Sequence, residues 1–188
     1  VWLDTFDDVL SFVRDHPTIF VSHQWLGRRE PDPEGVHFPA IVAAAESICE
    51  RFDLAESDIY LWLDYSSIPQ RNKTLQTLSI NSLPVYSSVV RFFVCVCPPA
   101  THADTGKEVG ADAYQQRGWC RLEQLAHVTV AGYSNMYLYD GELRDIDHRG
   151  PWIDQTLRVL EGDFTDESDR AKMVDPVIGL WALAISVR

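Results

Sequence analysis

The sequence is poor in basic residues. Lys and Arg together number 16 against 28 Asp and Glu, so the formal net charge is −12. A surface of that sign repels the phosphates of nucleic acids and of anionic membranes unless a local basic patch overcomes the repulsion. The two small basic clusters, Arg28–Arg29 and Arg71–Lys73, contain no interleaved aromatic residues. We therefore expect no nucleic-acid partner.

Cysteines at metal-binding or disulfide spacing are also lacking. Cys49, Cys95, Cys97 and Cys120 form no C-x-x-C motif. A zinc site made of Cys95, Cys97, Cys120 and His102 would need a ligand spacing that the sequence does not have, so we expect no metal. Cysteines without such spacing are typical of buried, reduced thiols, and this pattern predicts a cytoplasmic protein.

Long hydrophobic runs and targeting signals are missing as well. The chain opens with Asp4, Asp7 and Asp8 and lacks the basic region that begins a signal peptide. The apolar run from Val177 to Val187 is too short to cross a bilayer, so we expect no membrane partner. No G-x-S-x-G motif occurs, which argues against a Ser–His–Asp hydrolase.

Apolar runs bounded by turn residues predict buried parallel strands. These runs are Thr18–Ser22, Ile59–Asp64, Arg91–Cys97 and Met136–Tyr139. The amphipathic segments between them predict helices over Phe38–Phe52, Thr77–Val89 (with a break allowed at Pro84) and Arg117–Val130. This alternation predicts right-handed βαβ crossovers in an α/β fold, with a flavodoxin-like, doubly wound parallel sheet of four or five strands.

The length of 188 residues fits a single domain over 1–188. We expect an N-terminal helix within 1–17 that Asp4 caps, a core over 18–140 and a helical C-terminal part over 141–188. In the C-terminal part, the segments with helical character are Trp152–Glu161 and Glu167–Val187, and Leu160–Thr165 is the candidate fifth strand. Tyr65–Leu75 and Thr101–Gln116 are predicted loops.

Polar and aromatic residues cluster where ligands bind in such folds. The first strand ends in Ser22-His23-Gln24-Trp25, the second ends in Asp64 and runs into Ser66, and a predicted helix starts at Trp119-Cys120-Arg121-Leu122-Glu123. The carboxyl ends of parallel strands meet at one edge of the sheet. We therefore expect one site that contains His23, Gln24, Trp25, Asp64, Ser66, Trp119 and Glu123.

These clusters resemble the motifs of one superfamily. Trp119-Cys120-Arg121-Leu122-Glu123-Gln124-Leu125 resembles the W-C-x-x-E-L signature of TIR domains. Read as Arg117-x-Trp119-x-x-x-Glu123, the segment is similar to the R-x-W-x-x-Q-E motif of fungal heterokaryon-incompatibility (HET) domains, which are TIR relatives. Trp62-Leu63-Asp64-x-x-x-Ile68-x-Gln70 resembles their W-I-D-x-L-C-I-x-Q, and Ser22-His23-x-Trp25 resembles their S-[YH]-x-W-G.

The resemblance implies a TIR-like effector domain that cleaves the nicotinamide–ribose bond of NAD+ in immune or cell-death signalling. NAD+ is then a substrate, and no cofactor is held. Glu123 would be the catalytic residue, with a carboxylate that stabilises an oxocarbenium ion, and Trp119 would stack beside it. Backbone amides near Gly27 and at a helix N-terminus would meet the pyrophosphate. Self-association through the Tyr65–Leu75 loop would activate the domain.

Two other functions fit the same residues. A TIR-like protein-interaction module without catalysis is favoured by the absence of basic residues directly after the first strand, where Gln24 and Trp25 stand. A nucleoside or nucleotide-sugar transferase would use the same Glu123 chemistry on a ribose. Each residue also has an ordinary structural reading: Glu123 as a solvated helix residue, Trp119 and Trp25 as packing residues, Asp64 as a cap, His23 as a structural histidine, and Ser66 as a loop hydroxyl.

Overall fold

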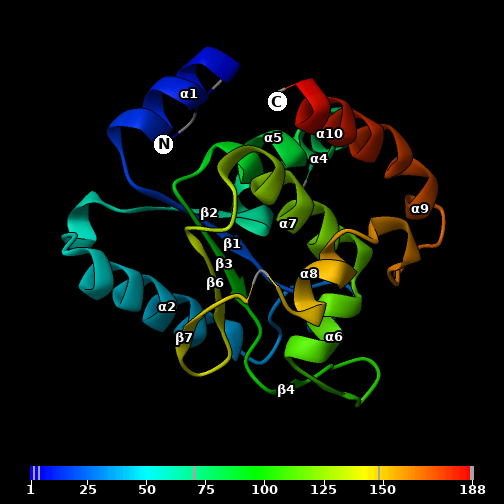
Figure 1. Ribbon diagram of the computed structural model, residues 1–188. Coiled ribbons are helices and arrows are strands. Elements are labelled where there is room, and N and C mark those ends of the chain that lie inside the picture. The colour runs from blue at the N-terminus through cyan, green and yellow to red at the C-terminus, as the bar shows by residue number, and fades with distance from the viewer. Residues whose placement is uncertain (2, 4, 70, 148, 187–188) are drawn as a thin grey trace.

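Five strands form a mixed sheet at the centre of the molecule. The computed structural model describes residues 1, 3, 5–69, 71–147 and 149–186. In the five-stranded sheet, β1 (Thr18–Ser22), β2 (Tyr60–Leu63), β3 (Phe92–Val96) and β6 (Met136–Tyr139) are parallel, and β7 (Leu143–Asp145) pairs antiparallel with β6, in the order β2-β1-β3-β6-β7 (Figure 1). The α/β class and the strands predicted from the four apolar runs are confirmed.

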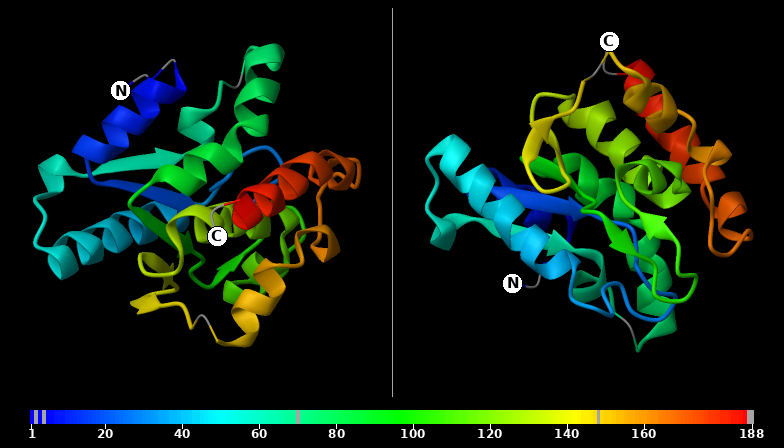
Figure 2. Two further views of the ribbon diagram at one scale, coloured as in Figure 1. Left: turned by 45° about the horizontal axis from the view of Figure 1, so that its top comes forward. Right: turned by 90° about the horizontal axis from the view of Figure 1, so that it is seen from below.

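Helices cover both faces of the sheet. Successive side chains of a strand point to opposite faces, so an apolar run supplies two cores at once. Ile19 and Phe92 pack against α2 (His37–Phe52), whereas Phe20 and Phe93 belong to the cluster that contains residues of α5 (Leu83–Val89) and α7 (Gly118–Ala131). Figure 2 shows α2, in cyan, on the opposite side of the sheet from α7.

The N-terminal helix is α1 (Phe6–Asp15). Its N-cap is Thr5, whose hydroxyl accepts a hydrogen bond from the amide of Asp8 while the Asp8 carboxylate accepts one from the amide of Thr5. This reciprocal capping box fixes the start of the helix. Asp4, the residue predicted to cap it, lies outside the described residues.

The fifth strand is not where the sequence predicted it. The segment Leu160–Thr165 contains the end of a 3-10 helix, η2 (Val159–Glu161), and Asp163, which forms an isolated bridge with Arg117. The fifth strand is instead β7, which follows β6 in a hairpin whose turn contains Gly141 at φ 128°. That conformation favours glycine.

The two predicted loops contain regular structure. The first, Tyr65–Leu75, includes most of the short helix α3 (Asp64–Ser67) and the start of α4 (Lys73–Asn81), which Asn72 caps. The second, Thr101–Gln116, takes part in the hairpin of β4 (Ala100–Thr101) and β5 (Glu108–Val109) and contains α6 (Ala111–Gln116). The predicted helix Thr77–Val89 is two helices, α4 and α5, with Ser82 between them and Pro84 in the first turn of α5.

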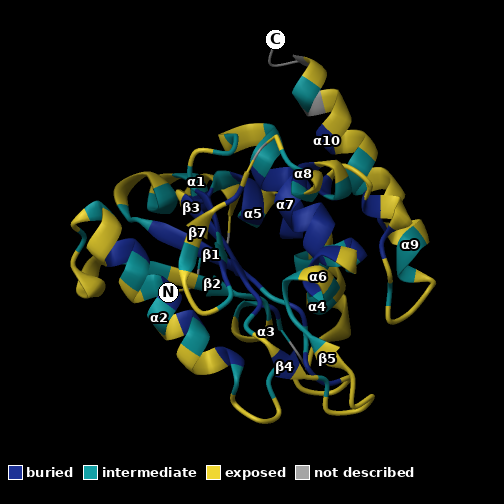
Figure 3. Cartoon of the chain, turned by 60° about the horizontal axis from the view of Figure 1, so that its bottom comes forward, coloured by how far each residue is buried: buried dark blue, intermediate teal, exposed yellow. Residues whose placement is uncertain are grey.

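The C-terminal part packs on α7. After β7, which also lies in this part, come α8 (Pro151–Thr156), η2, α9 (Asp169–Lys172) and α10 (Val174–Ser186), so each of the two predicted helices is broken. The buried amide of Gln124 holds α8 in place by accepting hydrogen bonds from the indole of Trp152 and the hydroxyl of Thr156. α10 buries Leu180 in a cluster with residues of α7. Figure 3 shows that much of the rest of α10 is exposed. Within the described residues, no helix is long and apolar enough to cross a membrane.

Candidate functional site

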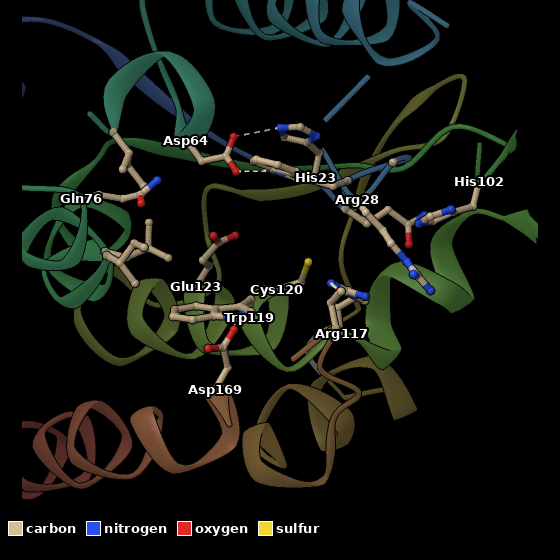
Figure 4. A pocket seen from close by; sticks show the side chains of 17 residues that line it. His23, Arg28, Asp64, Gln76, His102, Arg117, Trp119, Cys120, Glu123 and Asp169 are labelled. Carbon is tan, nitrogen blue, oxygen red and sulfur yellow. Dashed lines mark hydrogen bonds and ion pairs between the residues drawn. The ribbon is translucent and has the colours of Figure 1, made fainter. Parts of the chain in front are cut away.

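A cavity of about 330 Å³ opens at the carboxyl edge of the sheet. It lies where the strand order reverses between β1 and β3, which is the position at which open α/β sheets bind ligands. Figure 4 shows its side chains converging from the segment after β1 and from α3, α4 and α7. The predicted site residues that line it are His23, Gln24, Trp25, Asp64, Trp119 and Glu123.

Glu123 is not a solvated helix residue. Only 8% of its surface is exposed, and the hydroxyl of Ser22 donates a hydrogen bond to its Oε2. Burial raises the pKa of Glu123 to about 8; the bond from Ser22 opposes this rise, and the nearby charge of Asp64 adds to it. The carboxyl is therefore mostly protonated at pH 7.

Asp64 has the opposite protonation preference. Its carboxylate accepts hydrogen bonds from the indole Nε1 of Trp25 at 2.6 Å and the amide of Tyr65 at 2.6 Å, and His23 Nε2 lies 3.3 Å away. Burial raises the pKa of Asp64, but His23, Trp25 and Tyr65 together lower it by more, so the pKa is lowered overall. The cavity thus holds a carboxylate and a carboxylic acid at neutral pH, a combination typical of acid–base sites.

A second histidine orients His23. Nδ1 of His37 lies 3.1 Å from Nδ1 of His23, and Nε2 of His37 is buried without a partner among the described residues. Burial, with a smaller contribution from His23, lowers the pKa of His37 to about 4, so His37 is neutral. An unpartnered lone pair is cheaper than an unpartnered N–H, which places the proton of His37 on Nδ1. His23 thus lies between the imidazole of His37 and the carboxylate of Asp64.

Helix α2 offers no free N-terminal amides to a pyrophosphate. The carboxylate of Asp32 already accepts hydrogen bonds from the backbone N–H groups of Val36, His37 and Phe38, at 2.7 to 2.9 Å. A side-chain carboxylate thus occupies the anion site that this helix end creates.

Trp119 forms a wall of the cavity one helical turn before Glu123 (Figure 4). Its indole Nε1 donates to Oδ2 of Asp169 at 3.1 Å, and the ring also packs against the cores on either side of α7. The bond from α7 to α9 fixes the ring plane, so Trp119 both packs and faces the cavity. Its structural and functional interpretations are compatible.

Sequence reasoning missed the basic end of the cavity. Arg28, His102 and Arg117 line it, and Figure 4 shows them away from Asp64 and Glu123. The amide of Arg28 donates to Asp104 at 2.7 Å, which ties the segment after β1 to the β4–β5 hairpin, and Arg117 donates to the hydroxyl of Thr165 at 2.7 Å. The Arg28–Arg29 pair in the sequence was the available signal.

Two predicted residues have structural roles. Gln24 is buried at the cavity, and its amide Nε2 donates to the carbonyl of Gly110 at 3.4 Å. Ser66 does not line the cavity: its side chain is exposed and its hydroxyl donates to the carbonyl of Leu63, as a loop or helix-end hydroxyl does. The structure therefore separates Ser66 from the other candidates.

The cysteines and histidines of the described residues form no metal-binding cluster of three or more ligands. Cys49, Cys95, Cys97 and Cys120 are all buried and unpaired, and Cys120 lines the cavity beside Glu123. Comparison of the chain with known protein families, with characterised proteins and with solved structures finds no match.

Proposed function

We propose that this chain is a TIR-like NAD+ glycohydrolase domain. The observation that carries the proposal is the polarity of the cavity, with Asp64 and Glu123 at one end and Arg28, His102 and Arg117 at the other. NAD+ has the matching polarity, because its nicotinamide ring is a cation and its pyrophosphate is a dianion. Charge complementarity of this kind orients a substrate as well as attracting it.

The proposed binding mode follows from these ends. The pyridinium and its ribose lie beside Glu123 and Asp64, and the flat face of Trp119 stacks on the nicotinamide. Arg28 and Arg117 donate hydrogen bonds to the pyrophosphate. They replace the N-terminal amides of α2, which already bind the carboxylate of Asp32.

In the proposed reaction the bond between C1′ of the ribose and the ring nitrogen breaks, and its electron pair neutralises the pyridinium. Positive charge then develops on C1′ and the ring oxygen of the sugar, and the ionised carboxylate of Glu123 stabilises it. Water adds to C1′ and loses a proton, which gives ADP-ribose. The approach of a cation lowers the cost of ionising Glu123, so substrate binding favours the reactive form.

We propose that self-association activates the domain, in the cytoplasm and in immune or cell-death signalling. Within the Tyr65–Leu75 segment, Tyr65 and Leu75 are exposed, whereas Ile68 is buried against the cavity and Gln70 lies outside the described residues. Tyr65 and Leu75 are therefore the side chains that a second copy would contact.

Nicotinamide release per molecule is expected to rise with protein concentration. The measurement is initial rate over a hundredfold dilution series, with sedimentation velocity to record the oligomeric state. Leu75→Asp should weaken this dependence, because Leu75 is 48% exposed on the proposed contact; Val130→Asp, at a residue 51% exposed on the end of α7, is the matched control. A rate strictly proportional to concentration, from a protein that stays monomeric, contradicts activation by self-association.

A second candidate function, an interaction module without catalysis, is favoured by α10. Val174, Ile178, Trp181 and Ile185 are exposed apolar residues at spacings of four, three and four, so they form one stripe along this helix. Such a seam can pair with the same helix of a second copy. Two results together would support this function over the enzyme: the protein assembles but Trp181→Ser does not, and the parent protein never releases nicotinamide.

A further inference from the structure

Three buried hydroxyl and carboxyl groups form a chain beneath the cavity. Ser22, at the end of β1, lies 92 residues from Tyr114 of α6 and 101 residues from Glu123 of α7 in sequence. The hydroxyl oxygens of Tyr114 and Ser22 are 2.7 Å apart, and Ser22 donates to Glu123. Tyr114 is fully buried and Ser22 nearly so, so water does not compete for these bonds.

The direction of the chain follows from the number of protons. Ser22 has one hydroxyl proton. When Ser22 uses it to donate a hydrogen bond to Glu123, the oxygen of Ser22 can only accept a hydrogen bond from the hydroxyl of Tyr114. Both hydroxyl groups then point their positive ends toward the carboxylate. Chains of this kind polarise each bond in turn, and a bond to an ionised acceptor is stronger than one to a neutral acceptor.

We propose that Tyr114, acting through Ser22, is a positioning residue that fixes the direction of the Glu123 carboxyl group and favours its ionised state. If Glu123 is protonated on Oε1, the chain keeps its direction but loses its charge-assisted bond. If Glu123 is protonated on Oε2, the chain reverses, and Tyr114 is left with the thiols of Cys95 and Cys120 as neighbours. A thiol is a weak acceptor, so both protonated arrangements are weaker than the ionised one.

The other titratable groups that face Glu123 do not replace this role. Asp64, at the start of α3, is an anion that opposes ionisation of Glu123. Burial raises the pKa of Cys95 in β3, of Cys120 in α7 and of Tyr114 itself well above their usual values, so these groups keep their protons. Ser22 is the one hydrogen-bond donor to Glu123 recorded within the described residues, and Tyr114 supports it.

The test is the ionisation midpoint of Glu123, measured from the carboxyl ¹³C resonance of glutamate-labelled protein and assigned by its absence in Glu123→Gln. Ser22→Ala should raise the midpoint by about one to two pH units, because it removes a hydrogen bond to a charged group. Tyr114→Phe should raise it by about half a unit, because it removes only the polarisation of that bond. Tyr137→Phe changes another buried tyrosine, on the opposite face of the sheet, and should leave the midpoint unchanged.

A parent-protein measurement makes the test independent of folding of the variants. The phenolic ¹³Cζ resonance of Tyr114 should titrate with the midpoint of Glu123, whereas that of Tyr137 should not. The proposal is overturned if Tyr114 does not sense the ionisation, or if folded Ser22→Ala and Tyr114→Phe titrate like the parent. The ionisation does not depend on cleavage of NAD+. The catalytic consequence rests on the proposed function: in Ser22→Ala and Tyr114→Phe, the midpoint of the pH profile of kcat/KM should move to higher pH by as much as the NMR midpoint does.

Discussion

Glu123→Gln is expected to cleave NAD+ about a hundredfold more slowly than the parent, or slower still. Gln keeps the shape of the side chain and can still accept from Ser22, but it has no negative charge to set against the developing oxocarbenium ion. Loss of such a preorganised charge costs on the order of 3 kcal/mol of transition-state stabilisation. The measurement is nicotinamide release under single-turnover and steady-state conditions, and a folded variant with the parent rate would end the catalytic assignment.

The same substitution is expected to stabilise the fold at high pH, which distinguishes loss of activity from loss of structure. The folded-state pKa of Glu123 is about 8, against 4.5 for an unperturbed Glu, so the folded state binds its proton more tightly than the unfolded state does. The stability this group contributes is therefore fully present below pH 4.5 and is lost as pH rises toward 8. At pH 7 the loss is about 3 kcal/mol.

Thermal unfolding from pH 4 to pH 9 checks this. Glu123→Gln should melt with the parent near pH 4 and at a higher temperature at pH 8. Glu50→Gln changes an exposed glutamate on α2 and is the matched control, for which the difference from the parent should not grow with pH. If the difference in melting temperature between Glu123→Gln and the parent is the same at every pH, Glu123 ionises in the folded protein as it does in the unfolded chain, which contradicts the prediction.

The double variant Arg28→Gln/Arg117→Gln is expected to raise KM for NAD+ about a hundredfold with little change in kcat. Each arginine supplies a charge-assisted bond to the pyrophosphate, and each is partly open to solvent, so we expect about tenfold from each. The pyrophosphate does not change during the reaction, so its contacts stabilise the ground state and the transition state equally.

Arg29→Gln is the matched control for this pair. Arg29 adjoins Arg28 and is exposed, but it does not line the cavity, so KM should not change. Arg117 also donates to Thr165, and Tm of each variant is measured to separate binding from folding. If the double variant binds NAD+ as the parent does, the pyrophosphate does not lie at this end of the cavity.

The sequence predicted the parallel core because each strand is a continuous apolar run. β1 and β6 have the predicted bounds, and β2 and β3 lie within theirs. β7 was missed because Leu143, Arg144 and Asp145 form a short edge strand with no apolar run, and pairing with β6 through the Gly141 turn decides its structure. The short helices α3 and α6 were missed because neither is long enough to show helical periodicity.

The site was predictable to the extent that it depends on topology. His23, Trp25, Asp64 and Glu123 meet because the carboxyl ends of β1 and β2 and the start of α7 share one edge of the sheet. The burial of Glu123 was not predictable, because it depends on packing of α6 and α7 across β1. Arg28 and His102 lie in irregular segments, and the hydrogen bond between Arg28 and Asp104 that joins these segments has no sequence signature.

The pH dependence of kcat/KM for NAD+ tests the central claim most directly, because it joins the chemistry to one ionising carboxyl. The rate of nicotinamide release by the concentrated parent protein is measured from pH 5.5 to pH 9.5, with ADP-ribose quantified as the second product. Since the ionised form of Glu123 is the reactive one and its pKa is about 8, kcat/KM should rise close to tenfold per pH unit and level off above pH 8. Absence of nicotinamide release at every pH, or a rate that does not change across this range, would contradict the account.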